Sequence, residues 1–372
     1  MKQTKTNKLS QLLKHRIEFE GPLSVADFMT DALGHPEFGY YQTQEPFGKQ
    51  GDFTTAPEIS QMFGEIIAAF LIHNWHSIKC PQEIKLIELG PGRGTLMADI
   101  LRTIQKLCPD FFQTLEIHFV EMSKQLQTQQ ENAIVRFNKN GTWHASINDV
   151  PEGFSFIIAN EFFDALPIHQ YQLQPGNWME RKIHNASENS RDDFEFVLEP
   201  LQIDLPHFLP ESLSCQASVG DVFEFSSVSV AVMNHISERL TRDGGLALIL
   251  DYGHKHSGLG DTLQAVEKHK YCNPLSNPGF VDITAHVDFD VLVKAAKHND
   301  ALVYGPVDQR HFLLTLGIEQ RADALSSFSS SNKDKNDILS ALGRLTDPDQ
   351  MGNLFKVLAI SSKHFQQVPG FN

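Results

Sequence analysis

The stretch from Leu86 to Thr95 constrains the fold more than any other part of the chain. Apolar residues lead into the carboxylate of Glu88, and residues 96–102 continue with helical spacing. Three alternating glycines lie between them, at Gly90, Gly92 and Gly94. This order predicts a buried strand, a tight turn and the first turns of a helix. Glycine accepts positive φ and lets a ligand approach the backbone, and a helix start presents free N–H groups to anionic ligand atoms.

The same turn is compatible with several interpretations, one of which is purely structural. A dinucleotide site has the pattern G-x-G-x-x-G. Here the third glycine, Gly94, comes one position early, and Thr95 stands where that pattern needs Gly or Ala. The carboxylate of Glu88 suits a cationic group, such as an amino-acid ammonium, better than a pyrophosphate. The stretch therefore resembles motif I of the S-adenosylmethionine-dependent methyltransferases, and we favour that interpretation over an NAD site.

Composition argues against several classes of protein. The chain has 372 residues, of which 41% are hydrophobic and 21% charged, and its formal net charge is -15. Such an acidic chain is a poor candidate for binding nucleic acid, and no apolar run approaches the length of a membrane span. The cysteines form no C-x-x-C pair, and His269 with Cys272 has no second pair beside it, so we expect free thiols and no metal. The expected compartment is reducing: the bacterial cytoplasm or, alternatively, the mitochondrial matrix.

Two further segments read as strands of a doubly wound α/β sheet next to the first. Residues 115–121 form the second strand and end in Glu121. An acid after strand two of such a sheet typically receives ribose hydroxyls, although Glu121 could also be an ordinary exposed acid. Residues 143–147 read as a short third strand, whose end, with Ser146, would lie beside an adenine.

A fourth strand, residues 154–159, leads into a cluster of polar residues. Asn160, Glu161 and Asp164 interrupt strongly apolar surroundings, where an unpaired charge would be costly to bury. Helix caps would explain these residues structurally. The functional interpretation is a pair of carboxylates that bind and orient a nitrogen nucleophile.

The rest of the chain divides into segments of different character. We expect an N-terminal helical and lid segment (1–82), the cofactor-binding half of a Rossmann-like core (83–170), a β-rich insertion (171–225) and the remainder of the core with inserted helical and loop segments (226–372). Residues 47–58 lack periodicity and read as a loop packed as a lid. The Ser-rich, charged residues 326–337 read as an exposed loop, and residues 354–360 as a terminal strand.

Seven segments spread over nearly the whole chain carry a resemblance to a known family. They are Gly51–Glu58, Glu88–Gly94, Asn160–Pro167, Asp251–Gly253, Gly260–Ala265, Thr284–Phe289 and Met351–Lys356. With them the chain resembles the MidA family, which is homologous to the mitochondrial complex I assembly-factor methyltransferases. One mild departure is the family's Trp-x-Glu-Arg-x-Val, which here ends in Ile183.

The resemblance implies a class I methyltransferase core that uses S-adenosyl-L-methionine, with an N-terminal lid and inserted segments. It also implies methyl transfer to an arginine of a protein substrate, in mitochondria a core subunit of respiratory complex I. No nucleic-acid partner and no membrane insertion are expected. The substrate of the bacterial members and the oligomeric state stay open.

The candidate site residues then receive roles. Glu161, helped by Asp164 and accompanied by Asn160, would grip the fork of a guanidinium and localise a lone pair on one nitrogen. His286 would assist proton removal, although a core histidine is an equally good interpretation. For the cofactor, we expect the three glycines at the methionine moiety, Glu88 at its ammonium, Glu121 at the ribose and Ser146 at the adenine edge.

Two alternatives remain. An amino-group methyltransferase acting on a nucleic-acid base would use Asn160 in an Asn-Pro-Pro-Tyr type of motif, but both prolines are missing and the net charge has the wrong sign. A non-catalytic assembly factor could keep the fold as a cofactor-binding scaffold. The presence of Glu88, the glycines and Glu121 argues against an inactive site.

Overall fold

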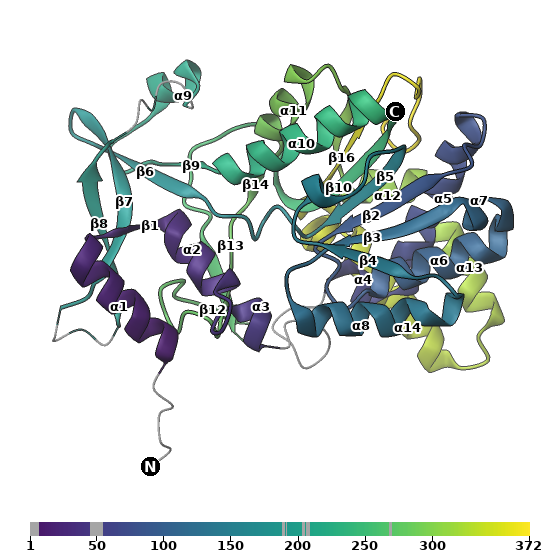
Figure 1. Ribbon diagram of the computed structural model, residues 1–372, viewed down its shortest axis with the longest axis horizontal. Coiled ribbons are helices and arrows are strands. Elements are labelled where there is room, and N and C mark those ends of the chain that lie inside the picture. The colour runs from purple at the N-terminus through teal and green to yellow at the C-terminus, as the bar shows by residue number, and fades with distance from the viewer. Residues whose placement is uncertain are drawn as a thin grey trace, which may run out of the picture. The chain divides into compact units, whose positions relative to one another are not determined.

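The chain forms two compact units in the computed structural model (Figure 1). The structure describes residues 7–44, 55–187, 190, 192–202, 205, 209–267 and 270–372. One unit, here called the core unit, comprises Thr54–Phe163, Val230–His256 and Val287–Asn372. The other, the accessory unit, comprises Met1–Phe53, Asp164–Ser229 and Ser257–His286.

The core unit is built on a mostly parallel sheet. Its strands are β2 (Ile84–Leu89), β3 (Leu115–Val120), β4 (Gly141–His144), β5 (Ser155–Asn160), β10 (Gly245–His254), β14 (Val287–Asp288), β15 (Leu302–Asp308) and β16 (Phe355–Ser361). The order across the sheet is β15-β16-β10-β5-β2-β3-β4, with β14 paired to the end of β10. Strands β4, β3, β2, β5 and β10 run parallel, whereas β16 is antiparallel to both β10 and β15. The predicted doubly wound sheet and its terminal strand are therefore confirmed.

The strand order reverses between β2 and β5. The chain proceeds from β2 outward through β3 to β4, then returns to add β5 on the opposite side of β2. In open α/β sheets, ligands bind beyond the carboxyl ends of the strands at such a reversal. Leu89 pairs with Ala159 in the last register step of these two strands. The residues that follow each strand therefore leave the sheet at the reversal point.

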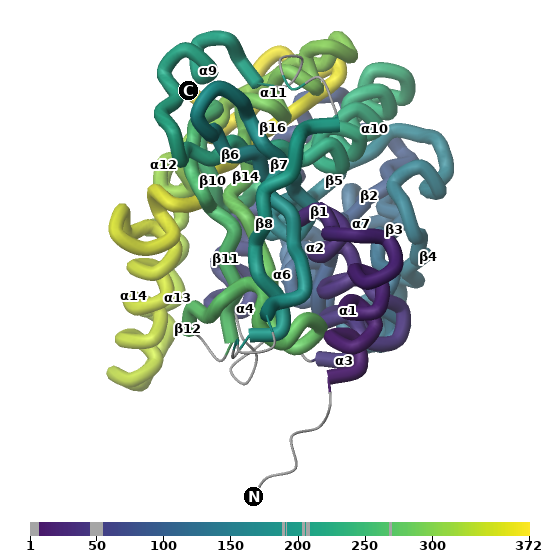
Figure 2. Tube along the Cα trace, turned by 90° about the vertical axis from the view of Figure 1, so that its left-hand side faces the viewer, coloured from purple at the N-terminus to yellow at the C-terminus, as the bar shows by residue number. Residues whose placement is uncertain are grey.

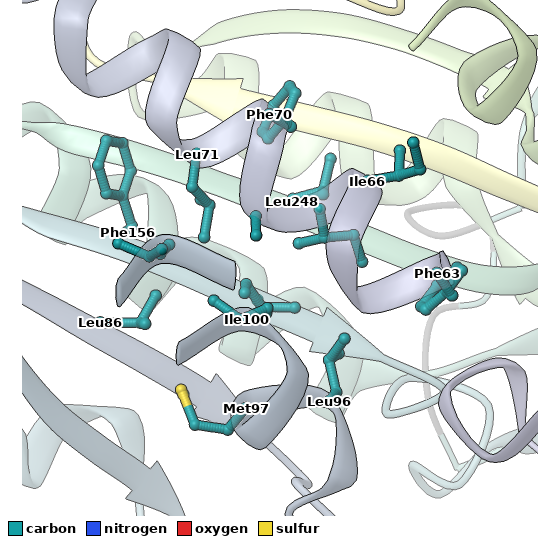
Figure 3. Packing of buried hydrophobic residues seen from close by; sticks show 14 of the residues in the cluster. Phe63, Ile66, Phe70, Leu71, Leu86, Leu96, Met97, Ile100, Phe156 and Leu248 are labelled. Carbon is teal, nitrogen blue, oxygen red and sulfur yellow. The ribbon is translucent and has the colours of Figure 1, made fainter. Parts of the chain in front are cut away.

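Helices α5 (Gln61–Ser77) and α6 (Thr95–Leu107) cover one face of this sheet. Apolar residues recur every three or four positions on both helices, which places them on one side of each. Figure 3 shows labelled side chains of α5 (Phe63, Ile66, Phe70 and Leu71), α6 (Leu96, Met97 and Ile100) and the strands (Leu86, Phe156 and Leu248), which belong to one buried apolar cluster. Helices α10 (Ser227–Asp243) and α11 (Phe289–His298) lie on the opposite face (Figure 1).

The exposed loop predicted for residues 326–337 is wrong. Helices α13 (Ile318–Phe328) and α14 (Asn332–Thr346) run side by side there and leave only three residues between them (Figure 2). Ser331 starts α14 as its N-cap, because its hydroxyl accepts hydrogen bonds from the backbone N–H groups of Lys333 and Asp334. Ala341 and Leu345 anchor α14 by burial in the core. Two of the serines therefore mark helix ends, Ser329 as the C-cap of α13 and Ser331 as the N-cap of α14.

Within its described residues, the accessory unit contains two antiparallel sheets. The larger consists of β1 (Leu23–Ser24), β6 (His169–Gln174), β7 (Asn177–Asn185), β8 (Phe194–Pro200) and β9 (Val222–Phe225). The smaller consists of β11 (Gln264–Glu267), β12 (Lys270–Cys272) and β13 (Asp282–Thr284). Strands β6 to β9 thus lie within, or start just before, residues 171–225, the insertion that we expect to be β-rich.

Helices α1 (Lys8–Glu20), α2 (Val25–Gly34), α3 (Tyr40–Thr43) and α9 (Glu211–Gln216) complete the accessory unit within the described residues. Leu13 of α1 and Phe28 of α2 are buried in one apolar cluster with Phe194 of β8, and the Phe28 and Phe194 rings meet edge to face. None of the helices in the described part of the chain is long and apolar enough to cross a membrane.

Candidate active site

The glycine turn has the conformation expected from the sequence. Strand β2 ends at Leu89 and α6 begins at Thr95. Between them Gly90, Gly92 and Gly94 have φ of 60°, 52° and 79°, a region that L-residues rarely adopt. A Cβ on Gly90 would lie 2.9 Å from a ring carbon of Phe162. Gly94 caps α6 without a side-chain hydrogen bond, so the turn offers backbone N–H groups to a ligand.

Glu88 is a buried carboxylate with an unpaired oxygen. It lies on β2 directly before the turn, and its side chain is 3% exposed. Within the described residues its Oε2 has no hydrogen-bond partner. Burial raises the pKa of this carboxyl to about 8. An unpaired buried carboxylate is costly, and a cationic ligand group would offset that cost.

Replacing Glu88 by Gln should stabilise the ligand-free protein and weaken cofactor binding. Because the pKa of Glu88 is about 8 when folded and 4.5 as a free side chain, between these values the folded state holds one proton more than the unfolded state. The free energy of unfolding of the wild-type protein therefore falls as pH rises through this range, whereas that of Glu88→Gln does not. We expect the stability gain of Glu88→Gln to be larger at pH 8 than at pH 6 by about 2 kcal/mol. Urea denaturation at both pH values measures this, and an equal gain at both would contradict it.

Glu121 follows β3 directly and is held by two neighbours. Its Oε1 accepts a hydrogen bond from Ser123 N (2.7 Å) and its Oε2 accepts one from Gln130 Nε2 (3.3 Å). Burial raises the pKa of this carboxyl, and the two hydrogen bonds oppose that rise. Glu121 is thus a half-buried, fixed acceptor rather than a freely exposed acid.

Glu121→Ala should weaken cofactor binding by about 1–3 kcal/mol, since a charged acceptor is lost. Glu116→Ala is the matched control, because Glu116 lies near the start of β3, the strand that Glu121 follows, and pairs with Lys85 there. Calorimetric titration of both variants with S-adenosyl-L-methionine measures the difference. Equal affinity of the two variants would leave Glu121 without a role in binding.

The short strand predicted for residues 143–147 is Gly141–His144 in the structure, so Ser146 lies beyond its end. Strand β4 ends at His144, and Ser146 instead caps a 3-10 helix, Ile147–Asp149. Its hydroxyl accepts from Asn148 N (3.3 Å), while its own backbone N–H donates to Asp149 Oδ2 (3.0 Å). Serine and aspartate three residues apart favour this capping box over a longer strand.

Asn160 and Glu161 leave the sheet where β5 ends. Glu161 has φ of 51°, which is uncommon for a residue with a side chain and often marks a functional site. Its Oε1 accepts hydrogen bonds from Ala56 N (3.1 Å) and from Asn160 Nδ2 (3.2 Å). On β10, the buried Asp251 accepts from the backbone N–H groups of Phe162 (3.1 Å) and Phe163 (2.9 Å). The backbone around Glu161 is therefore fixed from two strands.

The other two predicted catalytic residues belong to the accessory unit. The backbone oxygen of Asp164 accepts from Ala285 N (3.0 Å), and His286 N donates to Thr262 Oγ1 (2.9 Å). The structure thus brings the backbone of Asp164 beside the residue that precedes His286. Asn160 and Glu161 form a second pair in the core unit.

Helix α4 (Ala56–Ile59) contributes a residue that the sequence did not single out. Glu58 Oε1 accepts a hydrogen bond from the Thr95 hydroxyl (2.5 Å), and its Oε2 lies 3.8 Å from Arg93 Nη1. With the bond from Ala56 N to Glu161, this helix joins the glycine turn to the end of β5. The available signal was that Glu58 closes the segment Gly51–Glu58, whose residues 51–54 lie outside the described part of the chain. The same holds for most of the predicted lid.

These features together define a class of protein. A strand order that reverses between β2 and β5, a glycine turn at that reversal and an acid after the neighbouring strand β3 are the architecture of a class I S-adenosylmethionine-dependent methyltransferase. Residues 66–307 match a family described as "Putative S-adenosyl-L-methionine-dependent methyltransferase". The chain belongs to this family, and its cofactor is S-adenosyl-L-methionine.

Similar curated proteins match nearly the full length of the chain. The protein arginine methyltransferase NDUFAF7 homolog, mitochondrial, of Drosophila melanogaster is 38% identical over 95% of this chain and 84% of its own. The protein arginine methyltransferase NDUFAF7, mitochondrial, of Homo sapiens is 32% identical over the same shares.

Two solved structures from Burkholderia thailandensis share the fold. A COG1565 superfamily member bound to S-adenosyl-homocysteine has a TM-score of 0.82 at 24% identity and covers 97% of this chain and 93% of its own. A native crystal structure of a COG1565 superfamily protein has a TM-score of 0.80 at 25% identity, with shares of 98% and 94%.

Proposed function

We propose that this protein methylates an arginine side chain of a protein substrate. The observation that carries the proposal is the acid at the end of β5, Glu161, whose carboxylate is oriented by Ala56 N and Asn160 Nδ2 beside the strand reversal. The names of the curated relatives, which are 32% to 38% identical over 95% of the chain, support arginine as the acceptor.

We assign each of the proposed cofactor-binding residues to one part of S-adenosyl-L-methionine. Glu88, with its unpaired buried oxygen, suits the α-ammonium. Gly90, Gly92 and Gly94 leave room for the methionine moiety beside the backbone. Glu121 accepts the ribose hydroxyls. Ser146, whose hydroxyl is otherwise used as a helix cap, lies after β4 and is assigned to the adenine edge.

The work of the protein residues is alignment and charge control. When bound, the cofactor supplies an electrophilic methyl group on a sulfonium. The chain must hold the acceptor nitrogen in line with it. A guanidinium is planar and stays protonated in water, so a carboxylate that accepts from two of its N–H groups fixes its plane. In our proposal Glu161 does this and favours a lone pair on the remaining nitrogen, and Asn160 orients Glu161. From the sequence alone we further propose Asp164 as a helping carboxylate and His286 as the group that receives the released proton.

The finer identity of the substrate follows the relatives' names and the sequence resemblance. We infer a core subunit of a complex I-type NADH dehydrogenase, or its bacterial equivalent, as the acceptor. The relatives are named mitochondrial, and a reducing matrix or a bacterial cytoplasm suits a chain whose cysteines form no C-x-x-C pair.

Quantitative mass spectrometry of arginine methylation, in cells with and without this gene, tests the proposal. The expected result is one arginine site that loses its methyl groups without the gene and regains them with the wild-type gene. The Glu161→Gln gene should fail to restore them. Loss of methylation only at other residue types would contradict arginine as the acceptor. Cofactor binding with no change at any site would favour the scaffold alternative.

A further inference from the structure

Gln130 is a fully buried amide in a helix that is otherwise mostly polar. It lies on α8 (Lys124–Ile134), whose buried residues are Leu126, Gln130 and Ile134, one from each turn. The position therefore belongs to the apolar stripe that faces the core. Gln130 is 0% exposed, and a buried amide is unfavourable unless it is hydrogen-bonded. A polar residue at this position requires a reason.

Three hydrogen bonds supply that reason. Gln130 Nε2 donates to the backbone oxygen of Gly92 (2.7 Å) and to Glu121 Oε2 (3.3 Å). Gln130 Oε1 accepts from Trp143 Nε1 (2.7 Å). One side chain thus connects the glycine turn after β2, the acid after β3 and the indole on β4.

The chemistry of the three partners admits only an amide of this length. A carbonyl and a carboxylate both need a donor, whereas an indole N–H can only donate. A glutamate carboxylate could donate neither to Gly92 O nor to Glu121 Oε2, and methionine would remove all three hydrogen bonds. Because the Trp143 indole can only donate, the oxygen of the Gln130 amide must face Trp143 and its nitrogen must face Gly92 O and Glu121. The Trp143 ring is itself held by stacking on Phe119 (centroids 5.5 Å apart).

The close approach of α8 to the turn is a second constraint. A Cβ on Gly94 would lie 3.1 Å from Gln130 Cα. The backbone of α8 at Gln130 is therefore packed against the third glycine while its side chain holds the carbonyl of the second. Turn and helix fit together at this residue.

We propose that Gln130 is a positioning residue for the cofactor: it sets the spacing between the glycine turn and Glu121. Without it, Gly92 O and Glu121 lose a shared donor, and the two parts of the site are free to move separately. The proposal rests on the cofactor assignment and not on the identity of the methyl acceptor.

The test is calorimetric titration with S-adenosyl-L-methionine of Gln130→Met and of a matched control, Gln309→Met. Gln309 is also a 0% exposed glutamine of the core unit whose Nε2 donates to a backbone oxygen, that of Leu345 (2.9 Å). Both variants lose a buried amide, so both should lose stability. Only Gln130→Met should lose affinity, by about tenfold or more, as expected for unmade hydrogen bonds. Affinity within about twofold of wild type in Gln130→Met, or an equal loss in Gln309→Met, would overturn the proposal.

If Gln130→Met does not fold, a milder variant tests the positioning role of Gln130. Trp143→Phe keeps a ring to stack on Phe119 and removes only the donor that orients the amide. It should weaken cofactor binding by about threefold, with Trp178→Phe in the accessory unit as the control. Unchanged affinity in Trp143→Phe would overturn the proposal. Because neither titration needs a methyl acceptor, failure of the arginine assignment leaves this test intact.

Steady-state kinetics distinguishes a positioning role from a purely structural one, because only a positioning role predicts a change in KM for the cofactor without a change in kcat. With a working methyl acceptor, Gln130→Met should raise KM for the cofactor while kcat at saturating cofactor stays within about twofold of wild type. A fall in kcat with unchanged KM would place Gln130 in chemistry or overall stability and would contradict a positioning role.

Discussion

Glu161→Gln is expected to reduce methyl transfer at least about a hundredfold while cofactor affinity stays near that of wild type. The amide is nearly isosteric, and its oxygen can still accept from Ala56 N and Asn160 Nδ2, so the local structure should persist. What it loses is the negative charge that grips a guanidinium and polarises it toward a nucleophilic nitrogen. The measurement is methyl transfer to the protein substrate alongside a binding titration on the same preparation.

Glu152→Gln is a suitable control for this experiment, because that side chain is 78% exposed in the same unit. It should change neither quantity. Loss of cofactor affinity in Glu161→Gln would move Glu161 into the cofactor site. Unchanged turnover would mean that another carboxylate holds the arginine, with Asp164 the first to examine.

Gly92→Val should abolish measurable binding of S-adenosyl-L-methionine. Gly92 has φ of 52°, where a β-branched residue costs about 1–3 kcal/mol of strain, and the new side chain would fill space that the cofactor needs. Relief of that strain would also shift the carbonyl that Gln130 holds. Calorimetry on folded variant measures the loss, and NADH should show no specific binding to the wild-type protein in the same assay.

The control for backbone strain is Gly176→Val. Gly176 also has positive φ, 93°, but an added Cβ there would meet nothing within 4 Å, and the residue lies in the turn between β6 and β7. Both variants should lose stability, and only Gly92→Val should lose the cofactor. Normal affinity in a folded Gly92→Val protein would contradict the placement of the cofactor at this turn.

The parts of the fold that could be predicted from the sequence are those encoded in local patterns. Residues 86–102 show a buried strand, a glycine turn and helical spacing in the order of the chain, and the structure has β2, the turn and α6 there in that order. The run at residues 354–360 is apolar except for Lys356, as is typical of a strand with a neighbour on each side, and β16 lies between β10 and β15. Such signals need no knowledge of partners.

Two elements were not predicted, because contacts with residues far away in the chain stabilise them more than their local sequence pattern does. Strand β15 (Leu302–Asp308) is half-exposed along most of its length and interrupted by Gly305 and Pro306, so its sequence lacks a strand pattern. Helix α14 was hidden by the Ser-rich composition at its start, although Ala341 and Leu345 carry a helical repeat. For α14, the spacing of apolar residues was therefore a better guide than composition.

The site shows the same division. Glu88, the glycines, Glu121 and Glu161 stand at strand ends, where sequence order alone suggests a role. Gln130 and Glu58 could not be identified, because their meaning comes from the atoms they bond, Gly92 O and the Thr95 hydroxyl, which lie 38 and 37 residues away in the chain. A glutamine in a polar helix has no sequence signal that distinguishes it from its neighbours.

The most direct measurement of the central claim is transfer of label from methyl-labelled S-adenosyl-L-methionine to protein by the purified enzyme, followed by hydrolysis and identification of the labelled amino acid. A complex I-type NADH dehydrogenase core subunit serves as the first acceptor, and Glu161→Gln as the matched inactive enzyme. We predict labelled methylarginine with the wild-type protein and at least about a hundredfold less with the variant. Label on lysine or histidine instead, or equal label on arginine from both proteins, would contradict the account.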